Sequence, residues 1–163
     1  RHHQGKRGLA AVIDLDDMDR AVLRDLVAEG TLSAGELGRR HGLSQPATWR
    51  RVRRLEEAGV LKGLAVEVDR EKLGFGVTVF LGVKLATKGR VSLEDFERAV
   101  QAIPEVQVVQ HVLGLFDYRL RVVARDIADF ERVLRRRIMT LPGLGNVEAN
   151  VLLTEERRPG PLG

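Results

Sequence analysis

The chain contains no cysteine, and only 4% of its 163 residues are aromatic. Without cysteine it can form no disulfide, no thiolate metal site and no cysteine nucleophile. Histidine is also scarce, since only four occur, and His41 and His111 have neither metal-ligand spacing nor an evident carboxylate partner in the sequence. We therefore expect no metal, no cofactor, no catalytic residue and no enzymatic activity.

Long hydrophobic runs are absent too. No stretch approaches the roughly 20 apolar residues of a membrane span, and no signal peptide is evident, so we expect a soluble, cytoplasmic protein that does not bind membranes. Hydrophobic residues still make up 44% of the chain, which is enough for folded cores. The 27 Lys and Arg exceed the 23 Asp and Glu, and the isoelectric point near 9.9 favours a polyanionic partner.

The first half of the chain has the pattern of a helix-turn-helix. Apolar residues at three- and four-residue spacing predict helices over 15–28, 34–41 and 45–58. Ser33 and Ser44 precede the second and third helices as N-caps, and Gly42 lies in the tight turn between them. An alternating segment at 64–68 predicts a strand that would form a wing, which makes the whole segment a winged helix-turn-helix.

The third predicted helix is unusually basic. Its arginines suit phosphate groups and guanine edges, and its early turns suit base contacts. The alternative is that the charge run is an ordinary solvated face paired with neighbouring glutamates. Within the helix-turn-helix pattern we favour binding to double-stranded DNA. The expected DNA-contacting residues are Ser44, Gln45, Thr48, Trp49, Arg50, Arg51, Arg53 and Arg54.

Aspartates crowd the start of the first helix. They lack the glycine and terminal glutamate of a calcium-binding loop, and negative charge at this end suits the helix dipole. We therefore interpret them as helix-stabilising rather than cation-binding. The residues concerned are Asp14, Asp16, Asp17 and Asp19.

The second half alternates strands and helices in the order β-α-β-β-α-β. Strands are predicted over 77–85, 106–113, 118–124 and 147–153, with helices ending at Pro104 and at Pro142. This order is that of a ferredoxin-like domain, so the fold class is α+β. The expected organisation is a flexible segment or tag remnant at 1–13, the DNA-binding domain at 14–68, a linker at 69–76, the ferredoxin-like domain at 77–154 and a tail at 155–163.

Several of these segments together resemble the Lrp/AsnC family of feast/famine transcription regulators. The resemblance spans about residues 14–154 and rests on the segments 15–23, 36–37, 42–44, 50–61, 72–74 and 114–118. It implies a sequence-specific regulator that dimerises through its C-terminal domain, with assembly to tetramers or octamers in many members. It further implies that a small-molecule effector, expected here to be an amino acid, binds between C-terminal domains.

The loop after the second strand of the C-terminal domain resembles part of that family's effector site. A glycine lets backbone N–H groups approach a carboxylate, and an aspartate can receive an ammonium group. An ordinary hairpin turn would use the same residue types, so both interpretations stay open. The expected effector-binding residues are Gly114, Phe116, Asp117 and Tyr118.

Two other functions are compatible with this scaffold. Sirohaem decarboxylases resemble it in both halves, although only His111 and Arg119 would support such an enzyme here. An architectural protein that coats DNA with little sequence preference is the second alternative.

Overall fold

The computed structural model describes residues 11–86 and 89–162. Most of the segment interpreted above as a tag remnant or flexible arm lies outside these residues. The described chain forms two compact units, one of residues up to Val66 together with those from Arg157 onward, and one of Glu67–Glu156. No helix in the described parts has the length and apolar character needed to cross a membrane.

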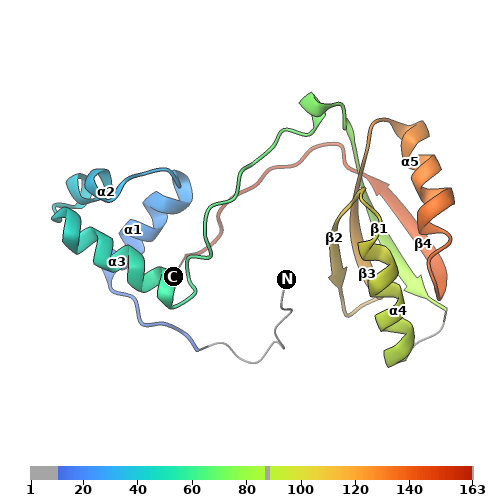
Figure 1. The fold of residues 1–163 in the computed structure, drawn as a ribbon, viewed down its shortest axis with the longest axis horizontal. Coiled ribbons are helices and arrows are strands. Elements are labelled where there is room, and N and C mark those ends of the chain that lie inside the picture. Colours follow the sequence, from blue (N-terminus) through green and yellow to red (C-terminus); the bar gives the residue numbers. More distant parts are fainter. Residues whose placement is uncertain (1–10, 87–88, 163) are drawn as a thin grey trace. The chain divides into compact units, whose positions relative to one another are not determined.

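The N-terminal unit contains three helices, and each begins at a side-chain cap. They are α1 (Asp17–Ala28), α2 (Ala34–His41) and α3 (Gln45–Glu57) (Figure 1). Asp16 and Ser33 each form a reciprocal capping box, with Asp19 and Glu36 respectively. The sequence predicted all three helices, and their ends differ from the prediction by at most two residues.

Helices α2 and α3 approach each other closely because Gly38 has no side chain. A Cβ atom at Gly38 would lie only 2.5 Å from the Leu43 carbonyl oxygen and 3.0 Å from the Thr48 hydroxyl oxygen. Gly42 joins the two helices with φ of 68°, a left-handed conformation that glycine adopts without steric cost. Leu37 and Leu55 are buried in the unit.

The strand predicted over 64–68 is not formed in the described structure. Leu64 and Val66 are 79% and 90% exposed, and the segment is assigned to no strand. An isolated segment with alternating polarity has no hydrogen-bond partner for its backbone, so the pattern alone does not make a strand.

The C-terminal unit is a four-stranded antiparallel sheet with two helices. Its elements are β1 (Val77–Leu85), α4 (Arg90–Gln101), β2 (Val106–His111), β3 (Tyr118–Ala124), α5 (Ile127–Val133) continued by a π-helical turn (Leu134–Ile138), and β4 (Leu144–Val151). The spatial strand order is β2-β3-β1-β4, with every neighbouring pair antiparallel. The predicted order and the α+β class are confirmed, although β2 ends two residues earlier than predicted and β4 begins three residues earlier and ends two residues earlier than predicted.

The core of this unit lies on the face of the sheet that α4 and α5 cover (Figure 1). Val79, Leu81 and Val83 of β1 point into this core, where they meet residues such as Phe96 of α4 and Ile138. The alternate β1 residues lie on the opposite face, and no helix of the described unit covers that face.

Candidate nucleic-acid interface and ligand-binding loop

Helix α3 has an exposed side, and Ser44 is the N-cap at which the helix starts. The Ser44 hydroxyl oxygen accepts a hydrogen bond from the Ala47 N–H group at 3.2 Å, and Pro46 occupies the first turn, where no N–H is needed. Gln45 is exposed, and Trp49 is 51% exposed although it is a large aromatic residue. The first turns of α3 therefore present polar and aromatic groups to a partner.

Thr48 does not belong to that surface. Its side chain is fully buried, and its hydroxyl donates to the Ser44 carbonyl oxygen at 2.9 Å. Because the residue packs against α2 near Gly38, it positions the start of α3 rather than reaching a partner. The expectation that Thr48 contacts DNA is corrected accordingly.

Two of the α3 arginines are tied to the start of α1. Arg51 Nη1 lies 2.8 Å from Asp16 Oδ1 and 2.9 Å from Asp19 Oδ1, and Arg54 Nη2 pairs with Asp19 Oδ2. The Asp19 side chain is fully buried, whereas that of Arg54 is 54% exposed. Hydrogen bonding to the Arg51 guanidinium lowers the pKa of Asp16. We call these four residues the α1–α3 ion cluster.

The ion cluster gives the aspartates a function that sequence analysis missed. The sequence predicts a helix-stabilising role for them, and the capping box that Asp16 forms with Asp19 at the start of α1 fits that role. Their partners on α3 lie more than 30 residues away in the chain, so no local pattern indicates the pairing.

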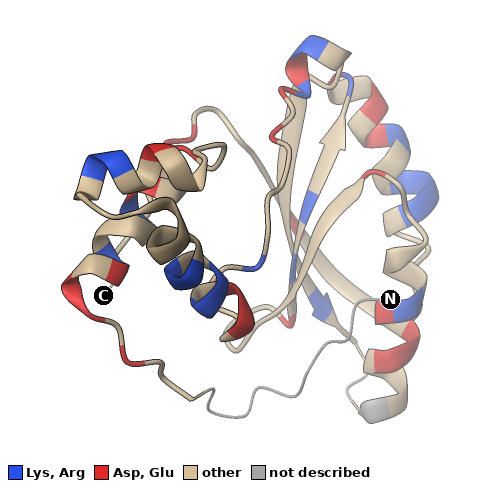
Figure 2. Cartoon of the chain, turned by 60° about the vertical axis from the view of Figure 1, so that its left-hand side comes forward, with Lys and Arg blue, Asp and Glu red and all other residues tan. Residues whose placement is uncertain are grey.

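The remaining arginines of α3 stay on its outer surface. The Arg53 guanidinium carbon lies 4.9 Å from the centre of the Trp49 ring, and its Nε donates to Glu57 at 2.9 Å. Arg50 is exposed, and no ion pair with it occurs among the described residues. The basic residues of α3 lie between positions 50 and 54, and acidic residues follow at its C-terminal end (Figure 2). The middle of α3, residues 50–54, is therefore the cationic part of the helix.

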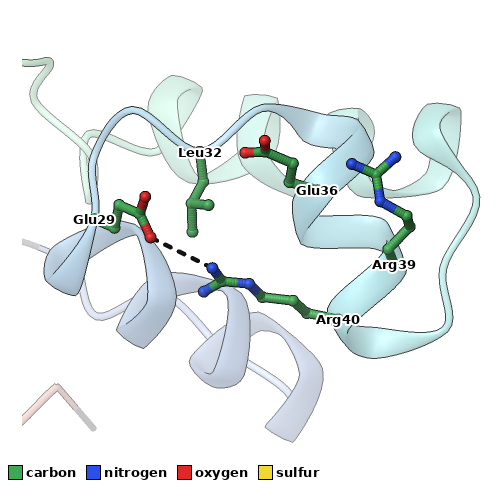
Figure 3. Close-up of a pocket in the computed structure, with 5 residues that line it drawn as sticks. All are labelled: Glu29, Leu32, Glu36, Arg39 and Arg40. Atoms are coloured by element: carbon green, nitrogen blue, oxygen red, sulfur yellow. Dashed lines mark hydrogen bonds and ion pairs between the residues drawn. The ribbon is translucent and has the colours of Figure 1, made fainter.

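A shallow hollow of about 370 Å³ lies between the end of α1 and α2 (Figure 3). Its lining carries two acidic and two basic side chains and a single leucine, and Arg40 Nη2 pairs with Glu29 at 3.3 Å. Because its charges balance and its walls offer little apolar surface, it has few features of a ligand site. The lining residues are Glu29, Leu32, Glu36, Arg39 and Arg40.

In the C-terminal unit, Asp117 holds the loop between β2 and β3 against β1. Its N–H donates to the Val83 carbonyl at 2.9 Å, and its Oδ2 accepts from the Leu85 N–H at 2.8 Å. Its carbonyl oxygen also accepts from the Val112 N–H at 3.0 Å. Asp117 therefore positions the loop between β2 and β3.

Phe116 and Tyr118 flank Asp117 but lie in different surroundings. The Phe116 ring covers Gly82, where a Cβ atom would come within 2.7 Å of it. Tyr118 is fully buried, its ring centre lies 4.6 Å from that of Phe96, and its hydroxyl donates to Glu97 Oε1 at 2.5 Å. Burial, followed by this hydrogen bond, raises the Tyr118 pKa. The sequence expectation that Tyr118 contacts an effector is corrected, since Tyr118 is a core residue.

The tip of the same loop is open. Leu113 and Leu115, on either side of Gly114, are 105% and 75% exposed, which is unusual for two large apolar residues so close in the chain. Gly114 has no positive φ, and a Cβ atom there would meet nothing within 4 Å. Neither backbone conformation nor internal packing therefore requires glycine at this position.

His41 and His111 each contact a side chain of the same unit. His41 Nε2 lies 2.5 Å from Asp25 Oδ2, which joins α2 to α1. The His111 ring stacks on Tyr118, with 4.8 Å between ring centres. Among residues 11–86 and 89–162, no group of three or more histidine or carboxylate side chains is placed to hold a metal.

Both units match known protein families. Residues 15–62 match the family described as winged helix-turn-helix DNA-binding, and residues 78–161 match the Lrp/AsnC ligand binding domain. Together with the basic α3 and the open loop, these matches define a DNA-binding transcription regulator with a ligand-binding domain. The chain belongs to the Lrp/AsnC family, whose members are transcription regulators and not enzymes.

Individual relatives are similar over nearly their whole length. The proline dehydrogenase transcriptional activator of Rhizobium radiobacter is 34% identical, covering 90% of this chain and 94% of its own. The leucine-responsive regulatory protein of Escherichia coli K12 is 32% identical, with 91% of each chain covered. A Neisseria meningitidis transcriptional regulator solved with L-methionine has 27% identity and a TM-score of 0.83, covering 92% of this chain and 97% of that one.

Proposed function

We propose that the protein is a cytoplasmic, sequence-specific regulator that binds operator DNA as a homodimer through the exposed side of α3. The observation that carries this proposal is the outward-facing set at the start of α3, in which no neighbouring side chain neutralises Arg50 among the described residues. A helix with these groups at its N-terminal turns suits the major groove, and two copies related by dimer symmetry would read a pseudo-palindrome.

The α3 residues divide into three roles in this proposal. Gln45, Trp49 and Arg50 reach base edges, while Ser44 and Arg53 contact the phosphate backbone. Arg51 and Arg54 first hold α3 against α1. Because a guanidinium group has five N–H donors, their exposed parts can still approach phosphates.

The DNA proposal is tested by replacing Arg50 with alanine and measuring fluorescence anisotropy on the upstream region of the protein's own gene. We expect binding to weaken about 10- to 100-fold, because a bidentate arginine contact contributes about 1–3 kcal/mol. The unfolding midpoint should not change, since Arg50 is exposed and is not one of the buried core residues.

A matched control is Arg136→Ala, which removes an exposed arginine from the C-terminal unit. We expect this variant to bind the same DNA as the unmodified protein does. Equal binding by Arg50→Ala and the unmodified protein would contradict the assignment of α3 as the recognition helix.

We further propose that an amino acid is the effector and that it binds at the tip of the 112–117 loop, between C-terminal domains. Support comes from the exposed Leu113 and Leu115, from a glycine at 114 that internal packing does not require, and from the leucine- and methionine-linked relatives. Binding there would alter assembly or the spacing of the DNA-binding units, and so operator affinity.

This effector proposal is tested by titrating the protein with L-leucine and with L-methionine while recording the methyl NMR signals of Leu115. Asp117→Asn is the informative variant, because an amide oxygen can still accept the Leu85 N–H but carries no negative charge to attract an ammonium group. We expect at least about tenfold weaker binding by this variant. Unchanged Leu115 signals with both amino acids would refute this placement of the effector.

The homodimer is proposed to form through the sheet face that α4 and α5 leave open. Phe80 lies on this face, with the Arg121 guanidinium carbon 5.6 Å from its ring centre. The Arg121 Nε atom is buried without a hydrogen-bond partner in the described structure, which favours an additional partner for this face.

A further inference from the structure

A second hollow, of about 320 Å³, opens at the far end of β3 from the 112–117 loop. It lies wholly within the C-terminal unit, and its size is at the lower end of the range for small-molecule pockets. Its residues come from the segment before β1, from the α4–β2 connection, from the end of β3 and the residue after it, and from α5. They are Arg70, Phe75, Pro104, Glu105, Val123, Arg125, Asp129 and Arg132.

The cationic side of this hollow has more positive charge than its neighbours neutralise. Arg132 pairs with Asp129, whose pKa is lowered first by the Arg125 backbone N–H and then by the charges of Arg132 and Arg125. No ion pair with Arg70 or Arg125 occurs among the described residues. The Arg125 guanidinium carbon instead lies 6.0 Å from the centre of the Phe75 ring. The lining thus has three arginines against two carboxylates, and the guanidinium groups of Arg70 and Arg125, which form no ion pair among the described residues, can receive an anion even though the Arg125 charge also acts on Asp129.

The opposite charge in the hollow is also incompletely paired. Glu105 Oε2 is buried and has no hydrogen-bond partner within the described residues. A buried carboxylate oxygen without a donor is costly, so a ligand that supplies a cationic donor would be favoured there. Phe75, Pro104 and Val123 complete the lining with apolar surface.

We propose that this hollow is a second effector site, which binds a small α-amino acid with an apolar side chain. The ligand carboxylate is received by Arg70 and Arg125, its ammonium group by Glu105, and its side chain by Phe75, Pro104 and Val123. A simple anion would leave Glu105 without a donor, and a simple amine would leave the two guanidinium groups without an acceptor.

The site is distinct from the loop at 112–117. Residues 117 and 125 lie at opposite ends of β3, roughly 25 Å apart at the rise of an extended strand. Arg70 and Phe75 belong to the segment that leads from the DNA-binding unit into β1. A ligand that contacts them would restrict this connection, so the second site could influence DNA affinity independently of the first.

The test uses the full chain and L-leucine as the probe, with the methyl NMR signals of Val123 reporting this hollow and those of Leu115 reporting the loop. Isocaproate, which lacks the ammonium group, and isoamylamine, which lacks the carboxylate, are the matched control compounds. We expect leucine to shift the Val123 signals at micromolar to millimolar concentrations, and each control compound to bind at least about tenfold more weakly.

Two variants test the assigned roles. Glu105→Gln keeps the shape of the side chain and should weaken leucine binding at Val123 about tenfold or more, and Arg125→Gln should do the same. Arg136→Gln, an exposed arginine that does not line the hollow, should leave binding unchanged. Far-ultraviolet circular dichroism checks that each variant is folded.

Unmoved Val123 signals throughout the leucine titration would overturn the second site. Isocaproate binding as tightly as leucine, or Glu105→Gln binding leucine as tightly as the unmodified protein, would overturn the assignment of Glu105 to the ammonium group. Failure of the effector proposal for the loop is seen separately at Leu115, and failure of the DNA proposal in the anisotropy of the Arg50 variant.

Discussion

At the scale of single residues, the α1–α3 ion cluster shows that neighbouring arginines on one helix have different roles. Arg50 faces outward, whereas Arg51 and Arg54 meet the buried Asp19. The cost of disrupting the cluster depends on which charge is left behind. A guanidinium group without its partner can turn to water, but the Asp19 carboxylate cannot.

We therefore expect an asymmetric effect on stability. The double variant Arg51→Ala, Arg54→Ala leaves a buried unpaired carboxylate and should lower the free energy of unfolding of the N-terminal unit by about 3–5 kcal/mol. Asp19→Asn removes the buried charge and should cost about 1–2 kcal/mol. Urea denaturation followed by the fluorescence of Trp49, the single tryptophan, measures both. A larger loss for Asp19→Asn than for the double variant would contradict this account.

At the scale of elements, the contact between α2 and α3 depends on the absence of a side chain at Gly38. Glycine inside a helix costs about 1 kcal/mol in propensity relative to alanine, so the sequence alone suggests that alanine would stabilise α2. The structure reverses that expectation, because the backbone of Leu43 occupies the space that a Cβ atom would need.

Gly38→Ala is accordingly expected to destabilise the N-terminal unit by about 1–3 kcal/mol, the usual cost of overpacking. The control is Gly35→Ala in the same helix, where a Cβ atom would have its nearest neighbours at 3.8 Å. Thermal unfolding of the two variants side by side measures the difference. A higher midpoint for Gly38→Ala than for the unmodified protein would show that α2 and α3 separate more easily than the packing implies.

At the scale of the whole molecule, the proposed function depends on association, because no element of the described C-terminal unit covers the open sheet face or the exposed loop tip. A sheet buries its apolar face against another layer of the fold. In this unit α4 and α5 supply that layer on one face only. The partly buried Phe80 and Arg121 on the other face are the features that favour a second copy of the chain.

Phe80→Lys should therefore convert dimers to monomers, since it introduces a charge beside Arg121 on the proposed contact face. Met139→Lys changes an exposed apolar residue next to the π-helical turn and should leave the dimer intact. Sedimentation velocity distinguishes the two outcomes. A Phe80→Lys dimer of unchanged affinity would exclude this face as the interface.

The sequence predicted the fold more completely than it predicted the binding residues. Local patterns indicated the helices and the strand order, since caps and periodicity depend on residues a few positions apart. The same reasoning counted Thr48 and Tyr118 among the binding residues, and it predicted a strand at 64–68. Each outcome depends on a neighbour in space. Thr48 is buried against α2, Tyr118 is buried and hydrogen-bonded to Glu97, and the segment 64–68 has no partner strand among the described residues.

The amino-acid order by itself determined the capped helices, the alternating strands and the basic character of α3, because these arise from contacts between residues close in the chain. Only the tertiary structure decided which charged side chains form ion pairs within the chain and which remain available to a partner. Asp19 is matched to Arg51 and Arg54, and Glu105 Oε2 has no donor among the described residues, because packing brings together or separates groups that are distant in the sequence.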